Sequence, residues 1–148
     1  EVLPRHRICC CDDLTGVALE VMRMLGESDY ETMVMEKGAL FLAGLQELKK
    51  KHKIVGDVDG LGLALRMEIC EPHDSFTPAK RLVDHMVDES FKADLDAGGG
   101  KTCGLVLDIG GYYKNVVTLA PSLHISKSEI ELAIRLLDQL LTRAAKAA

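Results

Sequence analysis

The 148-residue sequence contains no apolar stretch long enough to cross a bilayer, and its N-terminus has no basic region followed by an apolar one. The first absence excludes a membrane-spanning helix, and the second leaves no sign of a secretory signal peptide. We therefore expect a cytoplasmic protein with no membrane partner. Apolar residues make up 47% of the sequence, which is enough for the core of a single soluble domain.

Concentrated basic charge is absent as well. The formal net charge is -5 and the isoelectric point is about 5.5, whereas a nucleic-acid-binding protein needs a basic face. The one basic cluster, Lys49-Lys50-Lys51-His52-Lys53, lies at the predicted end of a helix, where cations complement the helix dipole. We expect no nucleic-acid partner.

Motifs that would form a self-sufficient active site are also missing. The histidines have no His-x-x-x-His spacing, and there is no Gly-x-Ser-x-Gly elbow. The segment Gly98–Thr102 ends like a phosphate-binding loop, but Leu95 occupies the position of its first glycine. We therefore expect no complete catalytic centre within the chain.

The five cysteines have no spacing typical of a metal site. Cys9, Cys10 and Cys11 are adjacent rather than separated as Cys-x-x-Cys, and an odd number argues against a secreted disulfide framework. We expect free, buried thiols in a reducing compartment, with a thiol redox or metal site as the alternative. We assign no metal ligands.

Periodic apolar residues predict two helices in the first third of the chain. The first spans residues 14–25, is capped by Asp12 or Asp13 and is ended by Gly26. The second opens at the Ser28 capping box and runs to about residue 52. Its predicted buried residues are Met33, Leu40, Phe41, Gly44, Leu45 and Leu48.

Two further helices are predicted in the second half. One follows a loop at residues 71–76, starts at Thr77–Pro78 and ends in a flexible link at residues 97–100. Its apolar face carries Leu82, Val83, Met86, Val87 and Phe91. The last helix opens at the Ser126 capping box. Its apolar face carries Ile130, Ala133, Ile134, Leu137, Leu140 and Leu141.

Strands are predicted between these helices. Residues 54–71 form a strand region that is interrupted by three glycines, Gly56, Gly60 and Gly62. Its apolar residues Leu63, Leu65, Met67 and Ile69 alternate with Ala64, Arg66 and Glu68, as in a strand with one buried face. Glycine inside a strand marks a bend, a bulge or the close approach of another backbone. Two short strands, 104–109 and 116–120, are joined by a turn. The predicted fold class is α+β: a small, mostly antiparallel sheet covered by helices on one side.

Four short motifs follow one another along the chain. Val55–Leu63 reads Val-Gly-Asp-Val-x-Gly-x-Gly-Leu, Glu68–Ile69 follows, Leu119–Leu123 reads Leu-Ala-Pro-x-Leu, and Ser128–Ile130 reads Ser-Glu-Ile. In this order they resemble the C-terminal small domain of class III pyridoxal-phosphate-dependent aminotransferases. That group includes dialkylglycine decarboxylases and the diaminobutyrate, ornithine and 4-aminobutyrate aminotransferases.

The resemblance implies the C-terminal domain of a pyridoxal-phosphate-dependent transferase fold. Residues 1–13 would be a lead-in from an upstream large domain, and residues 14–148 would be the small domain. The implied cofactor, pyridoxal 5'-phosphate, is bound mainly by the large domain. The aldimine lysine is expected upstream, so no catalytic residue is assigned in this chain.

The implied reaction is amino-group transfer between an amine or amino acid and a keto acid. In it the small domain would contribute domain closure, substrate selection and dimer contacts. The implied partners are a small-molecule amino donor, a keto-acid acceptor and a second subunit in a homodimer.

The chain departs from the family pattern at several positions. Ile8 stands where a threonine reaches the cofactor phosphate, and Thr118 stands where an arginine binds a substrate carboxylate. Asp59 replaces another arginine, and Asp12-Asp13-Leu14 replaces an Asn/Asp-Pro-Leu turn. Thr118 is therefore the substrate-facing candidate and Ile8 the candidate at the cofactor-phosphate edge. Substrate preference and activity stay open.

Two other functions are compatible with the residues. One is a non-catalytic domain derived from an aminotransferase and retained for folding or dimerisation. The other is an unrelated α+β interaction domain. The sequence upstream of Glu1 discriminates between the enzyme and the non-catalytic domain. A large α/β region with a lysine at a strand end favours the enzyme, and a different domain favours the non-catalytic alternative.

Overall fold

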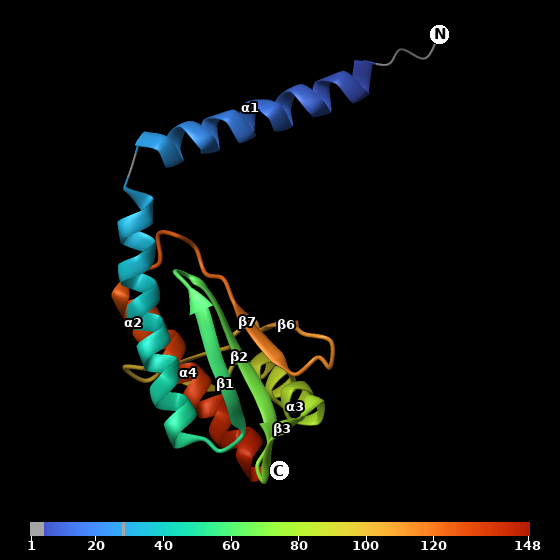
Figure 1. The fold of residues 1–148 in the computed structure, drawn as a ribbon, viewed down its shortest axis with the longest axis vertical. Helices are drawn as coiled ribbons and strands as arrows, with labels where there is room; N and C mark the ends of the chain where they lie inside the picture. Colours follow the sequence, from blue (N-terminus) through green and yellow to red (C-terminus); the bar gives the residue numbers. More distant parts are fainter. Residues whose placement is uncertain (1–4, 28) are drawn as a thin grey trace. The chain divides into compact units, whose positions relative to one another are not determined.

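The computed structural model describes residues 5–27 and 29–148, with side chains from residue 14 onward. Figure 1 shows the order of helices and strands along the chain. The chain divides into two compact units, Glu1–Met33 and Val34–Ala148. Within the described residues, no helix combines the length and the apolar character needed to cross a membrane.

Helix α1 (Arg5–Glu27) begins well before its predicted start at residue 14. Neither glycine nor proline occurs between residues 5 and 15, so nothing in that segment interrupts a helix. The predicted caps Asp12 and Asp13, and the predicted turn at Asp12-Asp13-Leu14, are therefore wrong, because these residues lie inside α1. The predicted apolar stripe is largely exposed: Leu14 and Met22 each expose 70% of their surface.

Helix α2 (Tyr30–Lys51) follows. Its predicted cap, Ser28, lies outside the described residues, and the Oδ1 atom of Asp29 accepts a hydrogen bond from the backbone N–H of Thr32 at 3.1 Å. Of the residues predicted to be buried, Leu40 is exposed, because it lies about 100° around the helix from Phe41. The buried residues of α2 are Gly38, Phe41, Leu45 and Leu48.

The main sheet has the strand order β1-β2-β7-β6, with β3 paired to β2, and every pairing is antiparallel. The glycine-rich segment forms the β1–β2 hairpin, with Gly62 in its turn at a φ of 55°. The predicted alternation along β2 is confirmed, since Leu65, Met67 and Ile69 are buried. The strands are β1 Val55–Leu61, β2 Ala64–Glu71, β3 Asp74–Pro78, β6 Asp108–Gly110 and β7 Val116–Leu119.

The predicted helix start at Thr77–Pro78 is wrong. Both residues belong to β3, and helix α3 (Lys80–Phe91) begins after Ala79 without a side-chain cap. The hydroxyl of Thr77 donates instead to Asp74 Oδ2 at 2.6 Å within β3. Phe91, predicted to be buried, exposes 67% of its surface. The buried residues of α3 are Leu82, Val83, Met86 and Ser90.

The predicted flexible link at residues 97–100 is a hairpin turn. Strands β4 (Leu95–Gly98) and β5 (Lys101–Cys103) pair with each other, and Gly98, Gly99 and Gly100 have φ values of 90°, 61° and 76°. Only glycine adopts such values without strain. The predicted strand at 104–109 shortens to β6, because Leu105 donates its N–H to Ser90 O at 3.3 Å rather than to a strand.

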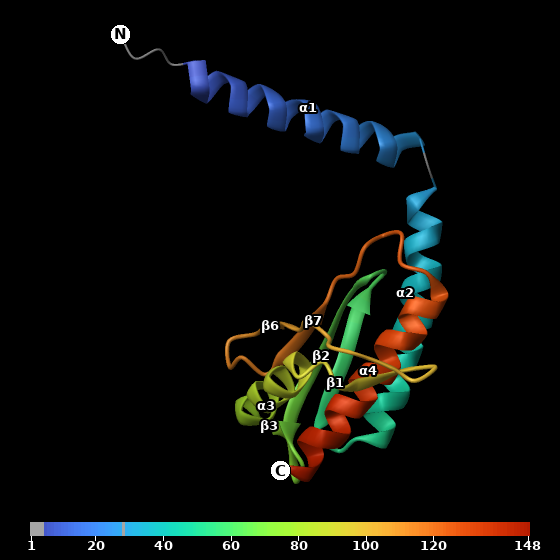
Figure 2. The same cartoon turned by 180° about the vertical axis from the view of Figure 1, so that it is seen from behind.

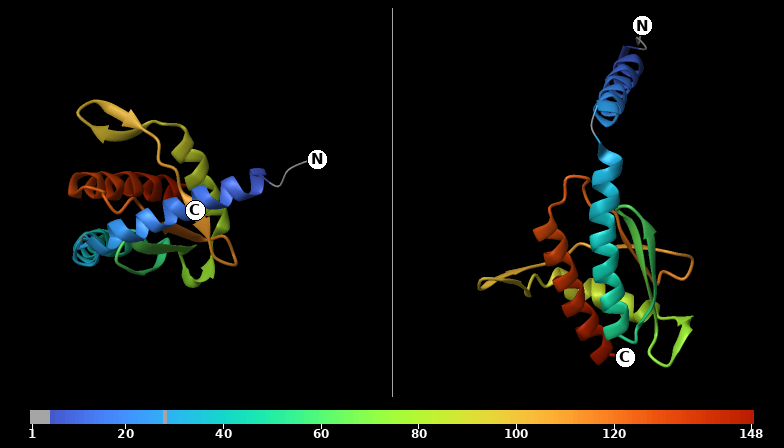
Figure 3. Two further views of the ribbon diagram at one scale, coloured as in Figure 1. Left: turned by 90° about the horizontal axis from the view of Figure 1, so that it is seen from above. Right: turned by 60° about the vertical axis from the view of Figure 1, so that its left-hand side comes forward.

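Helix α4 (Lys127–Lys146) opens with the predicted capping box. Ser126 Oγ accepts from the N–H of Glu129 at 3.2 Å, and Glu129 Oε2 accepts from the N–H of Ser126 at 2.7 Å. Buried residues of α2, α3 and α4 form one cluster with the inner face of the sheet. Figure 2 shows α3 and α4 on one side of the sheet, and Figure 3 shows the same helices from two further directions. The predicted α+β fold class is confirmed.

The opposite side of the sheet carries polar side chains, because successive residues of a strand point to opposite faces. We call this side the outer face and define it by Asp57, Asp59, Arg66, Glu68, Asp108 and Thr118.

Candidate functional site

Thr118, the predicted substrate-facing residue, belongs to a row of four residues that crosses the outer face. The strand register pairs Asp59 with Arg66, Arg66 with Thr118, and Thr118 with Asp108. Directly opposed residues of antiparallel strands place their Cβ atoms about 4.5–5.5 Å apart on the same face. The fold therefore brings Asp59 and Thr118, which both depart from the family pattern, to either side of Arg66.

Arg66 is bound on one side only. Its Nη2 atom donates to Asp57 Oδ2 at 3.3 Å and to Asp59 Oδ2 at 3.4 Å, and both acceptors belong to β1. The side chain of Arg66 exposes 44% of its surface and that of Asp59 exposes 66%. Such exposed ion pairs contribute little to stability. They do orient the Arg66 side chain, because both acceptors lie on β1 and so direct the guanidinium toward β1 and away from Thr118.

Asp57 keeps its charge next to Arg66. Its Oδ1 atom accepts a hydrogen bond from Lys49 Nζ at 3.0 Å, so the last turn of α2 contacts β1. This hydrogen bond holds the pKa of Asp57 below its ordinary value. The carboxylate is therefore ionised at neutral pH.

Asn115 fixes the start of β7 and is a residue that sequence reasoning missed. It exposes 2% of its surface. Its amide donates to Glu68 Oε1 at 3.1 Å and to Ile69 O at 3.0 Å, which satisfies a buried polar group. Its own carbonyl accepts from the N–H of Ile69 at 2.8 Å. The available signal was an amide residue between a glycine turn and an apolar strand.

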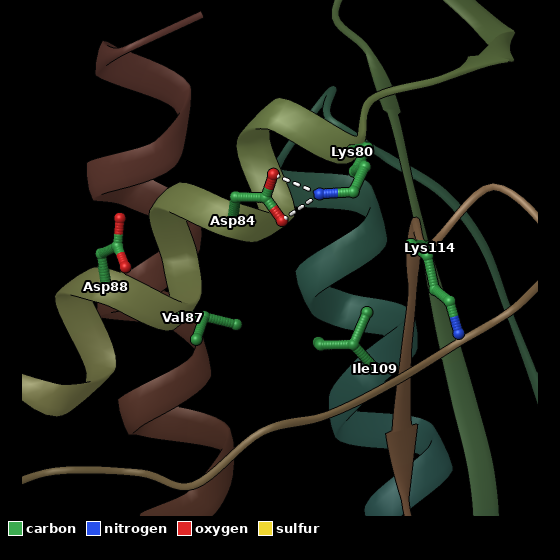
Figure 4. A pocket seen from close by; sticks show the side chains of 6 residues that line it. All are labelled: Lys80, Asp84, Val87, Asp88, Ile109 and Lys114. Carbon is green, nitrogen blue, oxygen red and sulfur yellow. Dashed lines mark hydrogen bonds and ion pairs between the residues drawn. The ribbon is translucent and has the colours of Figure 1, made fainter.

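Two cavities lie elsewhere in the second unit. One of about 390 Å³ is lined by Ser122, His124, Ile125 and Glu129. The other, of about 510 Å³, is lined by Lys80, Asp84, Val87, Asp88, Ile109 and Lys114 (Figure 4). In the second cavity Lys80 binds Asp84 at 2.5 and 2.7 Å, and Lys114 points away from this pair. Neither cavity gathers the predicted site residues.

The remaining positions singled out in the sequence are Ile8 and the cysteines. Ile8 belongs to α1, but its side chain lies outside the described residues, so its place at the cofactor-phosphate edge stays a prediction. Cys70 and Cys103 are free thiols, of which Cys70 is buried. Burial raises the pKa of the Cys70 thiol, which keeps it protonated. Among the described residues, no group of three His, Cys, Asp or Glu side chains could hold a metal ion.

The curated proteins similar to this chain include several aminotransferases. An uncharacterized aminotransferase of Schizosaccharomyces pombe is 33% identical over 133 residues, which cover 88% of this chain and 28% of that protein. The 5-aminovalerate aminotransferase DavT of Pseudomonas aeruginosa is 29% identical over 124 residues, covering 84% of this chain and 27% of that protein. No family model matches the sequence.

Solved structures of the same fold also include aminotransferases. A Bacillus anthracis aminotransferase superposes with a TM-score of 0.70 at 25% identity, covering 85% of this chain and 27% of that one. An amine transaminase of an uncultivated Pseudomonas species, solved in its PLP-bound form, superposes with a TM-score of 0.68 at 22% identity. It covers 86% of this chain and 26% of that one.

In fold and in sequence, this chain is therefore similar to one part of pyridoxal-phosphate-dependent transaminases. The predicted family is confirmed: the homologues of this chain are class III aminotransferases, whose cofactor is pyridoxal 5'-phosphate. The chain spans about a quarter of the length of the relatives that it matches.

Proposed function

We propose that this chain is the C-terminal small domain of a class III aminotransferase and that the outer face of its sheet takes part in substrate selection. The whole protein would transfer an amino group between an amine or amino acid and a keto acid. The domain would also contribute closure over the substrate and contacts within a homodimer. In this proposal residues 1–13 are a lead-in from an upstream large domain and residues 14–148 are the small domain. The proposed location of the protein is the cytoplasm.

The observation that carries the proposal is the row Asp59–Arg66–Thr118–Asp108. It places Thr118 at the centre of an open, polar face rather than in the core. The Thr118 hydroxyl can donate and accept one neutral hydrogen bond but cannot form the bidentate charged pair that an arginine forms with a carboxylate. A substrate group that meets Thr118 therefore gains no compensating charge from this residue.

The described residues do not fit the cofactor by themselves. A lysine that binds a carbonyl cofactor covalently works from an enclosed, dry pocket. In the part of the chain that the structure describes, the lysines are exposed except Lys37, which is half-buried and donates to Leu123 O at 3.0 Å. The upstream large domain would supply the lysine and most of the cofactor site, and this chain would supply the polar face that closes over the substrate.

The test uses the full-length protein that contains this chain. We expect it to bind pyridoxal 5'-phosphate through one lysine upstream of Glu1 and to transfer an amino group to a keto acid. Replacing that lysine with alanine should abolish the absorbance of bound cofactor and the transfer. Replacing the exposed Lys101 with alanine is the matched control and should change neither. A full-length protein that has no such lysine contradicts the proposal.

The second candidate is a non-catalytic domain that serves folding or dimerisation. The observation that favours it is the loss of both family arginines, at Asp59 and at Thr118, from one face. Under this alternative the full-length protein would form a stable dimer yet fail to bind the cofactor. Sedimentation and a cofactor titration on the same sample separate the two functions.

A further inference from the structure

The outer face offers one cation to a ligand. Among its described residues Arg66 is the only basic one, and it stands beside Asp57, Asp59, Glu68 and Asp108. Arg66 is also the direct cross-strand neighbour of Thr118. A charged contact that the outer face itself makes with a substrate carboxylate near Thr118 would therefore come from Arg66.

The existing ion pairs of Arg66 oppose its binding to a substrate carboxylate. Both of its ion pairs run from the same nitrogen, Nη2, to two carboxylates of β1. A bidentate grip on a carboxylate takes two adjacent N–H groups of the guanidinium. Because Nη2 already binds Asp57 and Asp59, one of these two ion pairs would have to break before Arg66 could bind a carboxylate through two N–H groups. It would also bring a further negative charge close to two carboxylates.

Asp59 is the more separable of the two partners. Its one described contact is with Arg66, and its side chain exposes 66%. Asp57 also binds Lys49, so its replacement would disturb the contact between α2 and β1 as well. Asp108 lies in the same row on the other side of Thr118 and has no described contact with Arg66.

We propose that Asp59, together with Asp57, withholds Arg66 from the substrate and so makes the enzyme favour an amine without a carboxylate at this position. The inference rests on the proposed function, because it takes the outer face to meet the substrate. Asp59 acts here as a positioning residue, through Arg66, and not by contact with the reacting atoms.

The test measures kcat and KM of the full-length enzyme for an α-amino acid and for the amine that lacks only its carboxylate. Asp59→Asn should release Arg66, lower the KM for the α-amino acid about five- to tenfold and leave kcat and the amine little changed. In an Arg66→Gln background the same replacement should have no such effect. Asp108→Asn is the matched control: it removes one charge from the same row, so its effect should be the same in the Arg66→Gln background as in the chain that keeps Arg66.

Binding gives a readout that is independent of turnover. Propionate, which has a carboxylate and no amine, should bind the Asp59→Asn enzyme more tightly than the unmodified enzyme by calorimetry. Thermal unfolding of each variant checks that the fold is intact, which the exposure of Asp59 leads us to expect.

Two results would overturn the inference. One is an Asp59→Asn enzyme whose KM ratio stays within twofold of the original. The other is a loss of α-amino acid binding on Arg66→Gln alone, which would show that Arg66 already holds the carboxylate. A full-length protein that transfers no amino group would contradict the proposed function instead, and propionate binding would still decide the role of Asp59.

Discussion

Gly38 on α2 and Gly62 in the β1–β2 turn meet backbone to backbone. A Cβ atom at Gly38 would lie 2.1 Å from the carbonyl oxygen of Gly62. No side-chain rotation relieves such a clash, so the turn would have to move. The contact anchors the hairpin that carries Asp59 and Arg66 to the helix. A close backbone approach was one of the three features, with a bend and a bulge, that the glycine-rich segment predicted.

Gly38→Ala should therefore destabilise the protein. Overpacking of this kind costs about 1–3 kcal/mol, which outweighs the gain of about 0.5–1 kcal/mol from the better helix propensity of alanine. Urea unfolding measures the difference. Gly16→Ala on α1 is the control, because nothing lies within 4 Å of its Cβ position, and it should not destabilise. Equal stability of the Gly38 variant would mean that the contact is absent in solution.

Leu137→Ala tests the packing of α4 on the sheet. Leu137 exposes 0% of its surface, and truncation of a fully buried leucine costs about 2–5 kcal/mol. Leu61→Ala, at a site that is 74% exposed, should change the free energy of unfolding by less than about 0.5 kcal/mol. A similarly small loss for Leu137 would place α4 at the surface.

Asp138 on α4 joins the end of α2 through two contacts. Its carboxylate accepts from Lys51 Nζ and lies against His52 Nε2, both at 2.6 Å. Burial opposes ionisation of Asp138, but the hydrogen bonds from Lys51 and His52 outweigh it and hold the pKa below its ordinary value. Because the folded pKa is the lower one, the stabilisation is complete above the unfolded pKa of about 4. It is lost as the pH falls through the folded pKa.

Asp138→Asn should accordingly cost about 1–3 kcal/mol near neutral pH and progressively less in acid. Denaturant titrations at neutral pH and in acid measure both values. Asp84→Asn is the control, since the Lys80–Asp84 pair is exposed on one helix and contributes only about 0.5 kcal/mol. A cost for Asp138→Asn that does not change with pH would contradict the ion pairs.

Thr118→Arg tests whether β7 faces the substrate. An arginine here would supply the charged partner that Thr118 lacks. In the full-length enzyme, the ratio of kcat/KM for an α-amino acid to that for the matching amine should rise about tenfold, equivalent to about 1.4 kcal/mol. Thr102→Arg on the separate β4–β5 hairpin should leave the ratio unchanged. If the Thr118 variant folds and its ratio also stays unchanged, Thr118 does not belong to the substrate site.

The chain alone should not bind pyridoxal 5'-phosphate at a specific lysine, because its described lysines lack an enclosed pocket. Incubation with the cofactor should give only weak, non-saturating absorbance of lysine adducts. Lys37, the half-buried lysine, is the one to replace first. A stoichiometric band that a single lysine replacement removes would show that the chain contains a cofactor site.

Features set by neighbouring residues were predictable from the sequence. The Ser126 capping box and the alternation of Leu65, Met67 and Ile69 depend on interactions within a few residues or on the period of a strand, and both are confirmed. The motif order alone also pointed to the family, because the spacing of glycine and proline residues is visible without a structure.

Features set by distant segments needed the tertiary structure. In α3 Ser90 is buried and Phe91 is not, because Ser90 faces the segment of Leu105, which donates its N–H to the Ser90 carbonyl. Thr77 lies in β3, which pairs with β2, and not at the start of a helix. The alignment of Asp59, Arg66, Thr118 and Asp108 is of the same kind. Nothing near Arg66 in the sequence reveals Thr118 as its neighbour. The pairing of β2 with β7 decides it, because a shift of one residue would turn every one of these side chains to the other face.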